Sequence, residues 1–224
     1  MSIFFNSLTL LMYLLSSFLT IKPQGPRPSP DTMLAGPRVS LRMGEPGDWR
    51  AWRHLREASR AFLEPWEPAW PPHALGYMHF CGLLRRQARD WRQGKSYNFL
   101  IFKRADSRSG VLAGGVALHD VQRGIAQKAT LGYWMGEAFA GQGLMTEAAG
   151  LACDFAFQTL RLHRLEASCM PTNEPSKRLL KRLGFAEEGY AKSYLRINGV
   201  WQDHLLWGIG AANPQTLGAN DRRD

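Results

Sequence analysis

The fold is decided by the stretch Leu131-Gly-Tyr-Trp-Met-Gly-Glu-Ala-Phe-Ala-Gly-Gln-Gly-Leu-Met-Thr-Glu-Ala148. Residues 131–135 form an apolar and aromatic run that is typical of a buried strand. Three glycines follow and predict a turn: Gly136, Gly141 and Gly143. From Thr146 the apolar residues take helical spacing. A strand, a glycine turn and a helix can hold a phosphate, because glycine lets the backbone approach closely and the first amides of a helix are unpaired.

Two common phosphate-binding motifs do not match this turn. A Walker loop requires a lysine and then serine or threonine after its last glycine, whereas Gly143 is followed by Leu144 and Met145. A Rossmann fingerprint requires three glycines in the pattern G-x-G-x-x-G, and Gly141 and Gly143 lack the third. An ordinary strand-to-helix turn remains an alternative to a phosphate site.

The overall composition indicates one globular domain with extensions and a basic surface. The chain has 224 residues, a formal net charge of +9 and 45% hydrophobic residues. This length suffices for one domain with a full core. The positive charge favours an acidic partner such as RNA, a ribosome or a polyphosphate cofactor, although surplus arginine is also common on a solvated surface.

The three cysteines, Cys81, Cys153 and Cys169, are odd in number and widely spaced. No C-x-x-C pair occurs, so the sequence predicts neither a disulfide framework nor a zinc site. We therefore expect a reducing compartment and no bound metal. A catalytic cysteine is disfavoured, because no spacing ties a histidine to any of the three.

The first 22 residues form a hydrophobic segment with two open interpretations. Residues 3–21 contain no charged residue, and their length is near the roughly 20 residues that span a bilayer. A signal peptide is a poor match, because no basic residue precedes them and no clear cleavage site follows. The segment is either a membrane anchor, or absent because translation begins at Met33 or Met43. Residues 23–37, rich in proline and glycine, are predicted to be a linker.

The first half of the folded body combines a strand, two helices and a stiff loop. We expect a strand over residues 39–43, a helix over 48–62 and an amphipathic helix over 74–91. The prolines of residues 62–72 exclude a regular helix there. Three aromatic rings on this loop either line a groove for a peptide or cover the core: Phe62, Trp66 and Trp70.

The amphipathic helix carries arginines on its outer side: Arg85, Arg86, Arg89 and Arg92. Such a face is usually only solvated. Contact with ribosomal RNA is the alternative interpretation, in line with the net positive charge.

The second half alternates strands and helices around the glycine turn. Strands are expected over residues 97–103, 111–118, 163–170 and from 185 to 190. Asn173 is a good N-cap for a helix that ends near Gly184. Asn198 and Gly199 favour a two-residue hairpin turn, and residues 211–224 form a polar tail. This order predicts an α+β fold with a mixed, mostly antiparallel sheet flanked by helices.

The glycine turn resembles the acetyl-CoA loop of the GNAT acetyltransferases, Q/R-x-x-G-x-G/A, over residues 140–145. Ala140 departs from the usual glutamine or arginine, and Met145 departs from the usual small residue. The resemblance continues at Asn173 and at Gly184-Phe185, since GNAT enzymes show an asparagine, a helix and Leu-Gly-Phe at this spacing.

Further stretches are similar to the RimJ/RimL branch of this family, which acetylates the N-termini of ribosomal proteins. Residues 188–204 resemble the end of that branch. Three stretches are most similar to the RimJ type: residues 60–68, 131–133 and 143–145. The similarity extends from Arg38 to Ile209, so the acetyltransferase domain is expected over residues 38–210.

The resemblance implies the GNAT fold and acetyl-CoA as the acetyl donor, with no metal. In this fold the central strand parts from its neighbour, and the acetyl group lies in the gap. Backbone amides near Trp134 and Met135 would face the thioester oxygen, and the glycine turn would hold the pyrophosphate. The implied cofactor-binding residues are Trp134, Met135, Gly141, Gln142, Gly143, Leu144, Met145, Thr146 and Asn173. Asn173 would reach the pantetheine arm, or serve only as an N-cap.

The resemblance also implies candidate catalytic groups. Many GNAT enzymes carry a proton-donating tyrosine where this chain has Leu180, whereas in the RimL type a serine three residues after the asparagine has this role, which implies Ser176. The general base of the RimL type corresponds to Leu195, which cannot act as one. The remaining candidate bases are His119, Glu188, Asp203 and His204, of which we select Glu188. A water relay is the alternative, because a terminal amine of pKa about 8 is partly neutral near pH 7.

The sequence thus predicts an enzyme that transfers acetyl from acetyl-CoA directly to the N-terminal alanine of a ribosomal small-subunit protein. Trp66 and Tyr133 are the candidate substrate-binding residues. We expect no DNA partner and a cytoplasmic protein, tethered to the inner face of the membrane only if residues 3–21 are a real anchor. Two alternatives remain open: an acetyltransferase for a small amine such as a polyamine or drug, and a non-catalytic acyl-CoA-binding or ribosome-associated module.

Overall fold

The computed structural model describes residues 27–104 and 110–211. They form one sheet of eight strands in the order β1-β2-β3-β4-β5-β6-β8-β7. The strands are β1 (Leu34–Ala35), β2 (Val39–Arg42), β3 (Tyr97–Lys103), β4 (Val111–Gln122), β5 (Lys128–Met135), β6 (Arg164–Cys169), β7 (Ala186–Ile197) and β8 (Val200–Gly210). The α-helices of these ranges are α2 (Trp49–Ala58), α3 (Arg60–Leu63), α4 (Tyr77–Gln93), α5 (Leu144–Asp154) and α6 (Glu174–Arg182).

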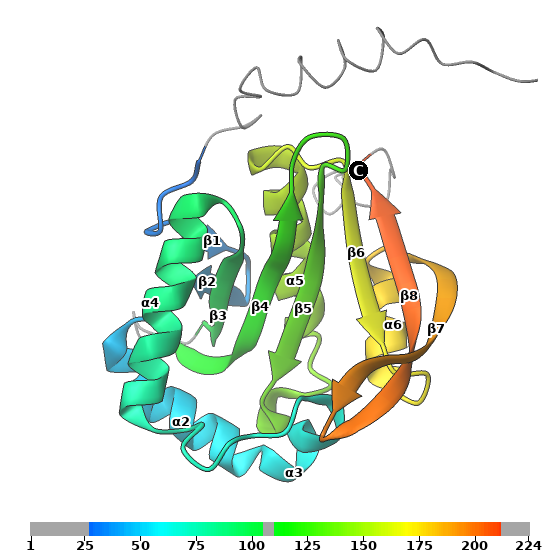
Figure 1. The fold of residues 1–224 in the computed structure, drawn as a ribbon. Helices are drawn as coiled ribbons and strands as arrows, with labels where there is room; N and C mark the ends of the chain where they lie inside the picture. The colour runs from blue at the N-terminus through cyan, green and yellow to red at the C-terminus, as the bar shows by residue number, and fades with distance from the viewer. Residues whose placement is uncertain (1–26, 105–109, 212–224) are drawn as a thin grey trace, which may run out of the picture.

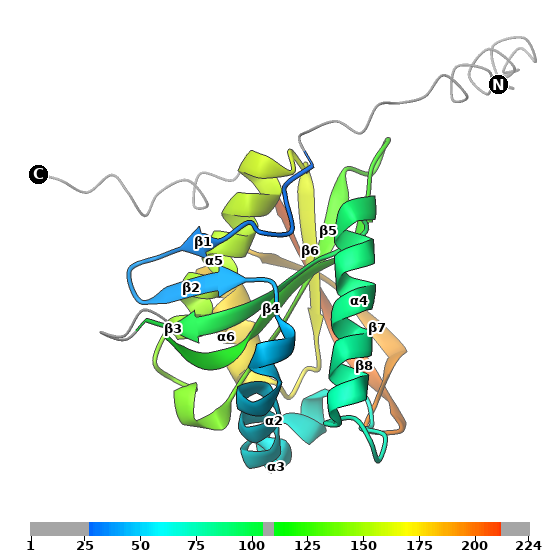
Figure 2. The same cartoon turned by 90° about the vertical axis from the view of Figure 1, so that its left-hand side faces the viewer.

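Helices cover both faces of the sheet (Figures 1 and 2). α5 and α6 lie on one face and α4 lies along the other, while α2 and α3 close the end of the sheet at which β5 stops. Every neighbouring pair of strands is antiparallel except β5 and β6. The expected α+β fold with a mixed, mostly antiparallel sheet is confirmed.

Small side chains let α5 approach the sheet closely. Four alanines of α5 and of the π turn that continues it are fully buried: Ala148, Ala149, Ala152 and Ala156. They pack in the main apolar core with residues of β2 to β6. Alanine loses no side-chain entropy in a helix. Its small side chain also lets the helix backbone lie close to the sheet. The start of α5 is thereby fixed relative to β5.

A smaller apolar cluster joins α2 and α4 to the other face of the sheet. Its buried members are Trp52, Leu55, Phe80, Leu84, Phe102 and Leu112. They come from α2, α4, β3 and β4, so this cluster determines how the two helices stand over the sheet.

Several element boundaries differ from those expected. The helix predicted over 48–62 breaks at Ser59, whose buried hydroxyl accepts a hydrogen bond from Glu137 N at 2.9 Å. β4 runs to Gln122 instead of ending at residue 118, after an irregular register between His119 and Gln122. α5 begins at Leu144, two residues before the helical spacing becomes visible in the sequence.

The two ends of the chain are only partly described. Residues 1–22, predicted as a hydrophobic segment, lie outside the described residues, and so does the tail from residue 212. Within the stretch 23–37, predicted to be a linker, β1 pairs with β2. No helix in the described part of the chain is long and apolar enough to cross a membrane.

We expect Gly114→Ala to lower the free energy of unfolding by about 1–3 kcal/mol, as overpacking does. A Cβ atom on Gly114 would lie 2.4 Å from Trp134 O and 3.1 Å from Met135 Cα, so the backbone of β5 would have to move. Denaturant unfolding measures the change. Gly82→Ala in α4 is the control, because its Cβ would meet nothing within 4 Å, and it should stabilise by up to about 1 kcal/mol. Equal destabilisation in both variants would contradict the close approach.

Candidate active site

The sheet opens where β5 parts from β6. These strands share only three residue pairs, from Lys128–Arg164 to Thr130–Glu166. Beyond that point β5 stays paired with β4, and β6 stays paired with β8. We call the facing edges of residues 131–135 and 167–169 the β5–β6 split. Backbone groups on these edges are free to bind a ligand.

The register directs the amide of Met135 into the β5–β6 split. Gly136 N donates to Ala113 O at 2.8 Å, so these two residues are a hydrogen-bonded pair. Such pairs alternate with non-hydrogen-bonded pairs in antiparallel strands. Met135, opposite Gly114, is therefore a non-hydrogen-bonded position, and its N–H points away from β4. By the same alternation the amide of Trp134 points toward β4, so of these two predicted donors only Met135 faces the split.

The turn after β5 leads directly into α5. Gly141 and Gly143 have φ angles of 73° and 75°, in the left-handed region that other residues rarely adopt. Gly143 is the N-cap of α5. The first amides of a helix lack intrahelical partners and lie at the positive end of its dipole. The turn is therefore suited to bind an anion.

An ion pair fastens this turn to the start of β2. Arg38 Nε donates to Glu147 Oε2 at 2.9 Å. The other two guanidinium nitrogens of Arg38 donate to the carbonyl oxygens of Gln142 and Gly143, at 3.0 and 3.2 Å. Burial raises the pKa of Glu147, but hydrogen bonds from Arg38 and from Val39 N outweigh burial and lower it. Glu147 therefore stays ionised, and Arg38 fixes the conformation of the turn.

Two hydroxyl groups meet across the β5–β6 split. Tyr133 Oη on β5 and Ser176 Oγ on α6 are 2.7 Å apart, and Ser176 is 8% exposed. Asn173 Oδ1 accepts a hydrogen bond from Ser176 N at 3.1 Å. Asn173 is therefore the N-cap of α6, as its sequence context predicts, and this cap holds Ser176 in the first turn of the helix.

Burial keeps Tyr133 protonated. Desolvation raises the pKa of Tyr133 well above its ordinary value, although the hydrogen bond with Ser176 lowers it. The phenol therefore carries its proton at every physiological pH. The pair of hydroxyls can hold a proton close to an anion that forms in the split.

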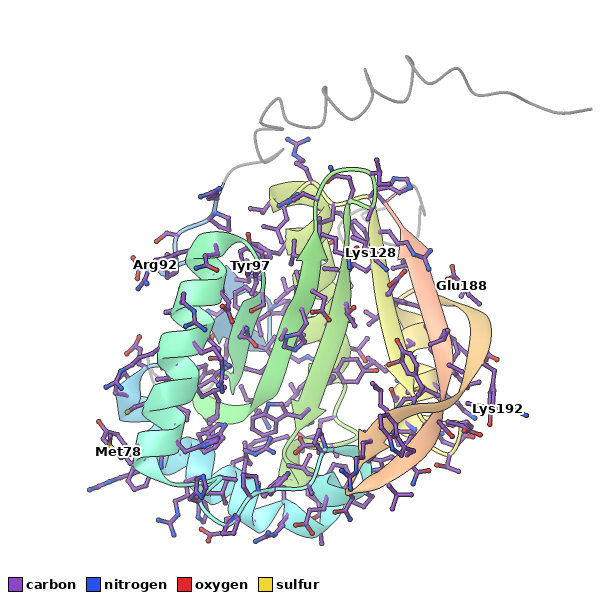
Figure 3. The ribbon with its side chains drawn as sticks, in the orientation of Figure 1. Met78, Arg92, Tyr97, Lys128, Glu188 and Lys192 are labelled. Atoms are coloured by element: carbon purple, nitrogen blue, oxygen red, sulfur yellow. The ribbon has the colours of Figure 1, made fainter. Side chains whose placement is uncertain are left out.

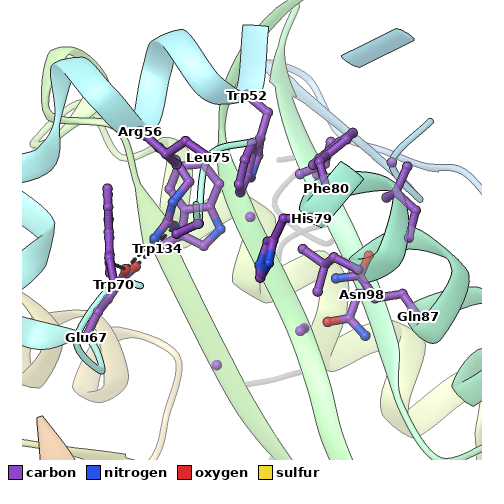
Figure 4. A pocket seen from close by; sticks show the side chains of 18 of the residues that line it. Trp52, Arg56, Glu67, Trp70, Leu75, His79, Phe80, Gln87, Asn98 and Trp134 are labelled. Atoms are coloured by element: carbon purple, nitrogen blue, oxygen red, sulfur yellow. Dashed lines mark hydrogen bonds and ion pairs between the residues drawn. The ribbon is translucent and has the colours of Figure 1, made fainter. Parts of the chain in front are cut away.

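A cavity of about 410 Å³ lies on the α4 face of the sheet (Figure 4). α2, α4, the proline-rich loop and the middle of β3 to β5 line it. Its polar lining is formed by Arg56, Glu67, His79, Gln87, Asn98 and His119. Gly132, Tyr133 and Trp134 also line it, so the cavity reaches β5 at the β5–β6 split. Such a volume is typical of a ligand pocket.

The proline-rich loop contributes Trp70 to this cavity, but Trp66 is not among the lining residues. Trp66 is 36% exposed, on the short 3-10 helix Glu64–Trp66. The Trp70 ring is turned inward, because its Nε1 donates to Glu67 Oε2 at 2.8 Å.

The candidate bases are scattered over the structure. Glu188 forms an ion pair with Arg164 and lies at the outer edge of the sheet, away from α4 (Figure 3). Asp203 accepts hydrogen bonds from Tyr190 Oη and from a backbone amide, and His204 is buried. The structure therefore does not bring Glu188 to Ser176 or to the cavity. Of the four candidates, His119 alone is among the described residues that line it.

The cysteines are free and buried. Burial raises the pKa of Cys153 to about 12 and also raises the pKa of Cys169. Both are therefore thiols at neutral pH and poor nucleophiles. In residues 27–104 and 110–211 no cluster of three or more side chains could hold a metal ion.

Sequence reasoning misses Arg38, Arg56 and Glu67. Arg38 contacts Glu147 across a separation of 109 residues, which no local pattern reveals. Glu67 stands in the stretch Trp66-Glu67-Pro68, where the aromatic rings and prolines, and not the carboxylate, are the visible signal. Arg56 is one of several arginines on α2, and nothing in the spacing marks it.

Comparison with known proteins agrees with the geometry. The family model described as acetyltransferase (GNAT) domain matches residues 38–186. The ribosomal protein uS5-alanine N-acetyltransferase of Escherichia coli (strain K12) is 35% identical over 181 residues, which cover 79% of this chain and 90% of that protein. The probable N-acetyltransferase YjcK of Bacillus subtilis (strain 168) is 45% identical over 115 residues, which cover 51% of this chain and 62% of that relative, less than two thirds of its length.

A solved structure extends the agreement to the fold. The structure of Mycobacterium smegmatis RimJ in complex with CoA-disulfide matches with a TM-score of 0.76 and 31% identity. The match covers 81% of this chain and 88% of the other chain. The GNAT fold expected from the sequence is confirmed.

The raised pKa of Tyr133 predicts a loss of stability in alkali. Above its ordinary pKa of about 10, this phenol ionises in the unfolded chain but keeps its proton in the folded one. Below that pH the buried phenol contributes its full stabilisation. Above it, the free energy of unfolding falls by about 1.4 kcal/mol per pH unit. Denaturant unfolding measures the free energy of unfolding at several pH values between about 10 and 11. In Tyr133→Phe this free energy should fall less steeply with pH than in the wild type, by the same slope. Parallel declines in the two proteins would contradict the burial of the phenol.

Proposed function

Because this chain belongs to the GNAT acetyltransferase family, we propose that it transfers the acetyl group of acetyl-CoA directly to the N-terminal alanine of a ribosomal small-subunit protein. One observation carries the proposal. The part of β5 that has separated from β6 lines a ligand-sized cavity and leads into a turn suited to bind an anion. A donor with a polyphosphate tail and an amine acceptor could therefore meet there.

The residues around the split fit acetyl-CoA. The turn Gly141-Gln142-Gly143 and the first residues of α5, Leu144, Met145 and Thr146, supply amides for the pyrophosphate. Arg38 and Lys103 add positive charge, since Lys103 Nζ lies 3.3 Å from Gln142 Oε1. The amide of Met135 is aimed to stabilise the thioester oxygen as it gains charge. Trp134 contributes its ring to the acceptor side, and Asn173 holds α6.

Ser176 is the group best placed to return a proton to the leaving thiolate. It stands on the opposite side of the split from Met135, and its oxygen shares a hydrogen bond with Tyr133. Tyr133 can replace the proton that Ser176 gives up. In this assignment Tyr133 belongs to the proton path as well as to the cavity wall.

The cavity suits the end of a peptide. Its aromatic walls and few polar groups are typical of sites that hold one small apolar residue and orient a polar amine. Trp66, exposed farther along the same loop, can contact the peptide outside the cavity. The arginines of α4 lie on an exposed face, where Arg92 is labelled in Figure 3, and they fit a ribosome-associated acceptor in the cytoplasm.

The test offers the full chain acetyl-CoA and two peptides. One peptide begins with a free alanine, and the other has a blocked N-terminus and an internal lysine. We expect acetylation of the first peptide alone. Release of the CoA thiol and the mass of the peptide product measure the reaction. Modification of the lysine would contradict an N-terminal specificity. Binding of acetyl-CoA without transfer to either peptide would favour a small-amine acceptor or a non-catalytic module.

Arg38→Ala should weaken acetyl-CoA binding about tenfold, or ~1.4 kcal/mol. The variant loses the hydrogen bonds that order the glycine turn. Because Arg38 is partly exposed, its hydrogen bonds contribute a free energy at the lower end of the range for charged donors. Isothermal titration calorimetry measures the dissociation constant. Arg92→Ala is the control, because this exposed arginine lies on α4 and not at the turn. An unchanged dissociation constant in Arg38→Ala would show that the Arg38–Glu147 ion pair does not contribute to acetyl-CoA binding.

A further inference from the structure

The proposed transfer needs a group that receives a proton from the acceptor amine. Such a base must lie within hydrogen-bond reach of the acceptor, so it belongs to the lining of the cavity. The described lining contains one carboxylate, Glu67, and two imidazoles, His79 and His119. None of the three belongs to the acetyl-CoA side of the split.

The two imidazoles are held in other parts of the lining. A Cβ atom on Gly132 would lie 3.3 Å from His119 Cδ2, which places His119 beside Gly132. Gly132 precedes Met135 by three residues, or about 10 Å along a strand. His79 is carried by α4, on the wall opposite the sheet, where its ring centre lies 5.9 Å from that of His73.

Glu67 is held beside Trp134 by its partners. Arg56 donates to both carboxylate oxygens of Glu67, at 3.2 Å to Oε1, and Trp70 Nε1 donates to Oε2 at 2.8 Å. The guanidinium carbon of Arg56 lies 4.4 Å from the Trp70 ring centre and 4.8 Å from the Trp134 ring centre. Figure 4 shows these side chains gathered at one end of the cavity. The Arg56 guanidinium therefore lies between the Glu67 carboxylate and the ring of Trp134, the residue that precedes Met135.

The main chain of Glu67 is fixed as well. Asn198 N, at the tip of the β7–β8 hairpin, donates to Glu67 O at 2.8 Å, and Pro68 follows in the sequence. A base that is anchored through both its backbone and its side chain keeps its position while the substrate binds.

On the basis of the proposed transfer, we propose that Glu67 is the catalytic residue that accepts the proton of the acceptor amine, with Arg56 and Trp70 as positioning residues. A carboxylate offers about four lone-pair positions. Three donors occupy three of them, so one position on Oε1 is left for an amine N–H. The side chains of Arg56 and Glu67 are 13% and 20% exposed, so an acceptor amine meets them in a partly dry site.

The ion pair suits a base that acts late. The positive charge of Arg56 disfavours the ammonium form of a bound amine and so favours the neutral nucleophile. When the nitrogen attacks the thioester carbon, the C–N bond forms and the nitrogen becomes strongly acidic. Glu67, which accepts a hydrogen bond from this nitrogen, can then take its proton. The C–S bond breaks and the thiolate takes a proton from Ser176. Glu67 releases its proton to solvent, and Ser176 regains one from solvent through Tyr133.

Glu67→Gln tests the assignment. Glutamine keeps the size of the side chain and one accepting oxygen for Arg56 and Trp70. With saturating acetyl-CoA and alanine peptide we expect kcat to fall about 100-fold, the lower end of general-base effects. The remaining rate should climb with pH through the range in which the wild-type rate is level. Acetyl-CoA affinity should match the wild type, and because the variant loses the ion pair with Arg56, kcat is compared well below the midpoint of its thermal unfolding.

Two further variants separate chemistry from structure. Glu64→Gln is the matched control: Glu64 pairs with Arg60 on the neighbouring turn and lies outside the cavity lining, so kcat should stay within about twofold. Arg56→Lys should raise the KM for the peptide more than it lowers kcat. An unchanged kcat and pH profile in Glu67→Gln would overturn the assignment, and so would a loss confined to KM. An inactive wild type would instead count against the proposed acceptor.

Discussion

The candidate active site depends on the separation of β5 from β6 after Thr130. Each strand keeps a hydrogen-bonded neighbour on its other side, β4 for β5 and β8 for β6, so the sheet survives the separation. Backbone groups left on the two inner edges need a polar partner. The same separation that weakens the sheet therefore creates the amide of Met135 as a donor and lets Ser176 approach Tyr133.

Two glycines leave room for side chains to pack on the α4 face of the sheet beside β5. A Cβ atom on Gly115 would lie 2.4 Å from Trp134 Nε1, and one on Gly136 would lie 2.3 Å from Leu55 Cδ1. These absent side chains let the Trp134 ring lie on β4 and let α2 reach the end of β5. Arg56 follows Leu55, so the packing of one apolar residue sets the position of the guanidinium that holds Glu67.

Local signals in the sequence predict most of the fold and the glycine turn of the candidate site. The glycine turn, the Asn173 cap and the Asn198-Gly199 hairpin each depend on backbone rules that act over a few residues, and all three appear where expected. The Arg38–Glu147 contact is long-range and has no local signature. The choice of Glu188 among four candidate bases has no deciding signal in the sequence, and the structure places Glu188 in an ion pair with Arg164, outside the cavity lining.

The hydrogen bond between Asn198 and Glu67 carries a consequence for the order of synthesis. Translation produces the proline-rich loop early and the β7–β8 hairpin among the last elements of the sheet. A nascent chain can form the glycine turn and α5 while the wall around Glu67 still lacks its support. Because Asn198 can donate to Glu67 O only once the β7–β8 hairpin has been made, this wall of the cavity is completed last. An unfinished chain therefore lacks the backbone hydrogen bond that holds Glu67 in the cavity wall.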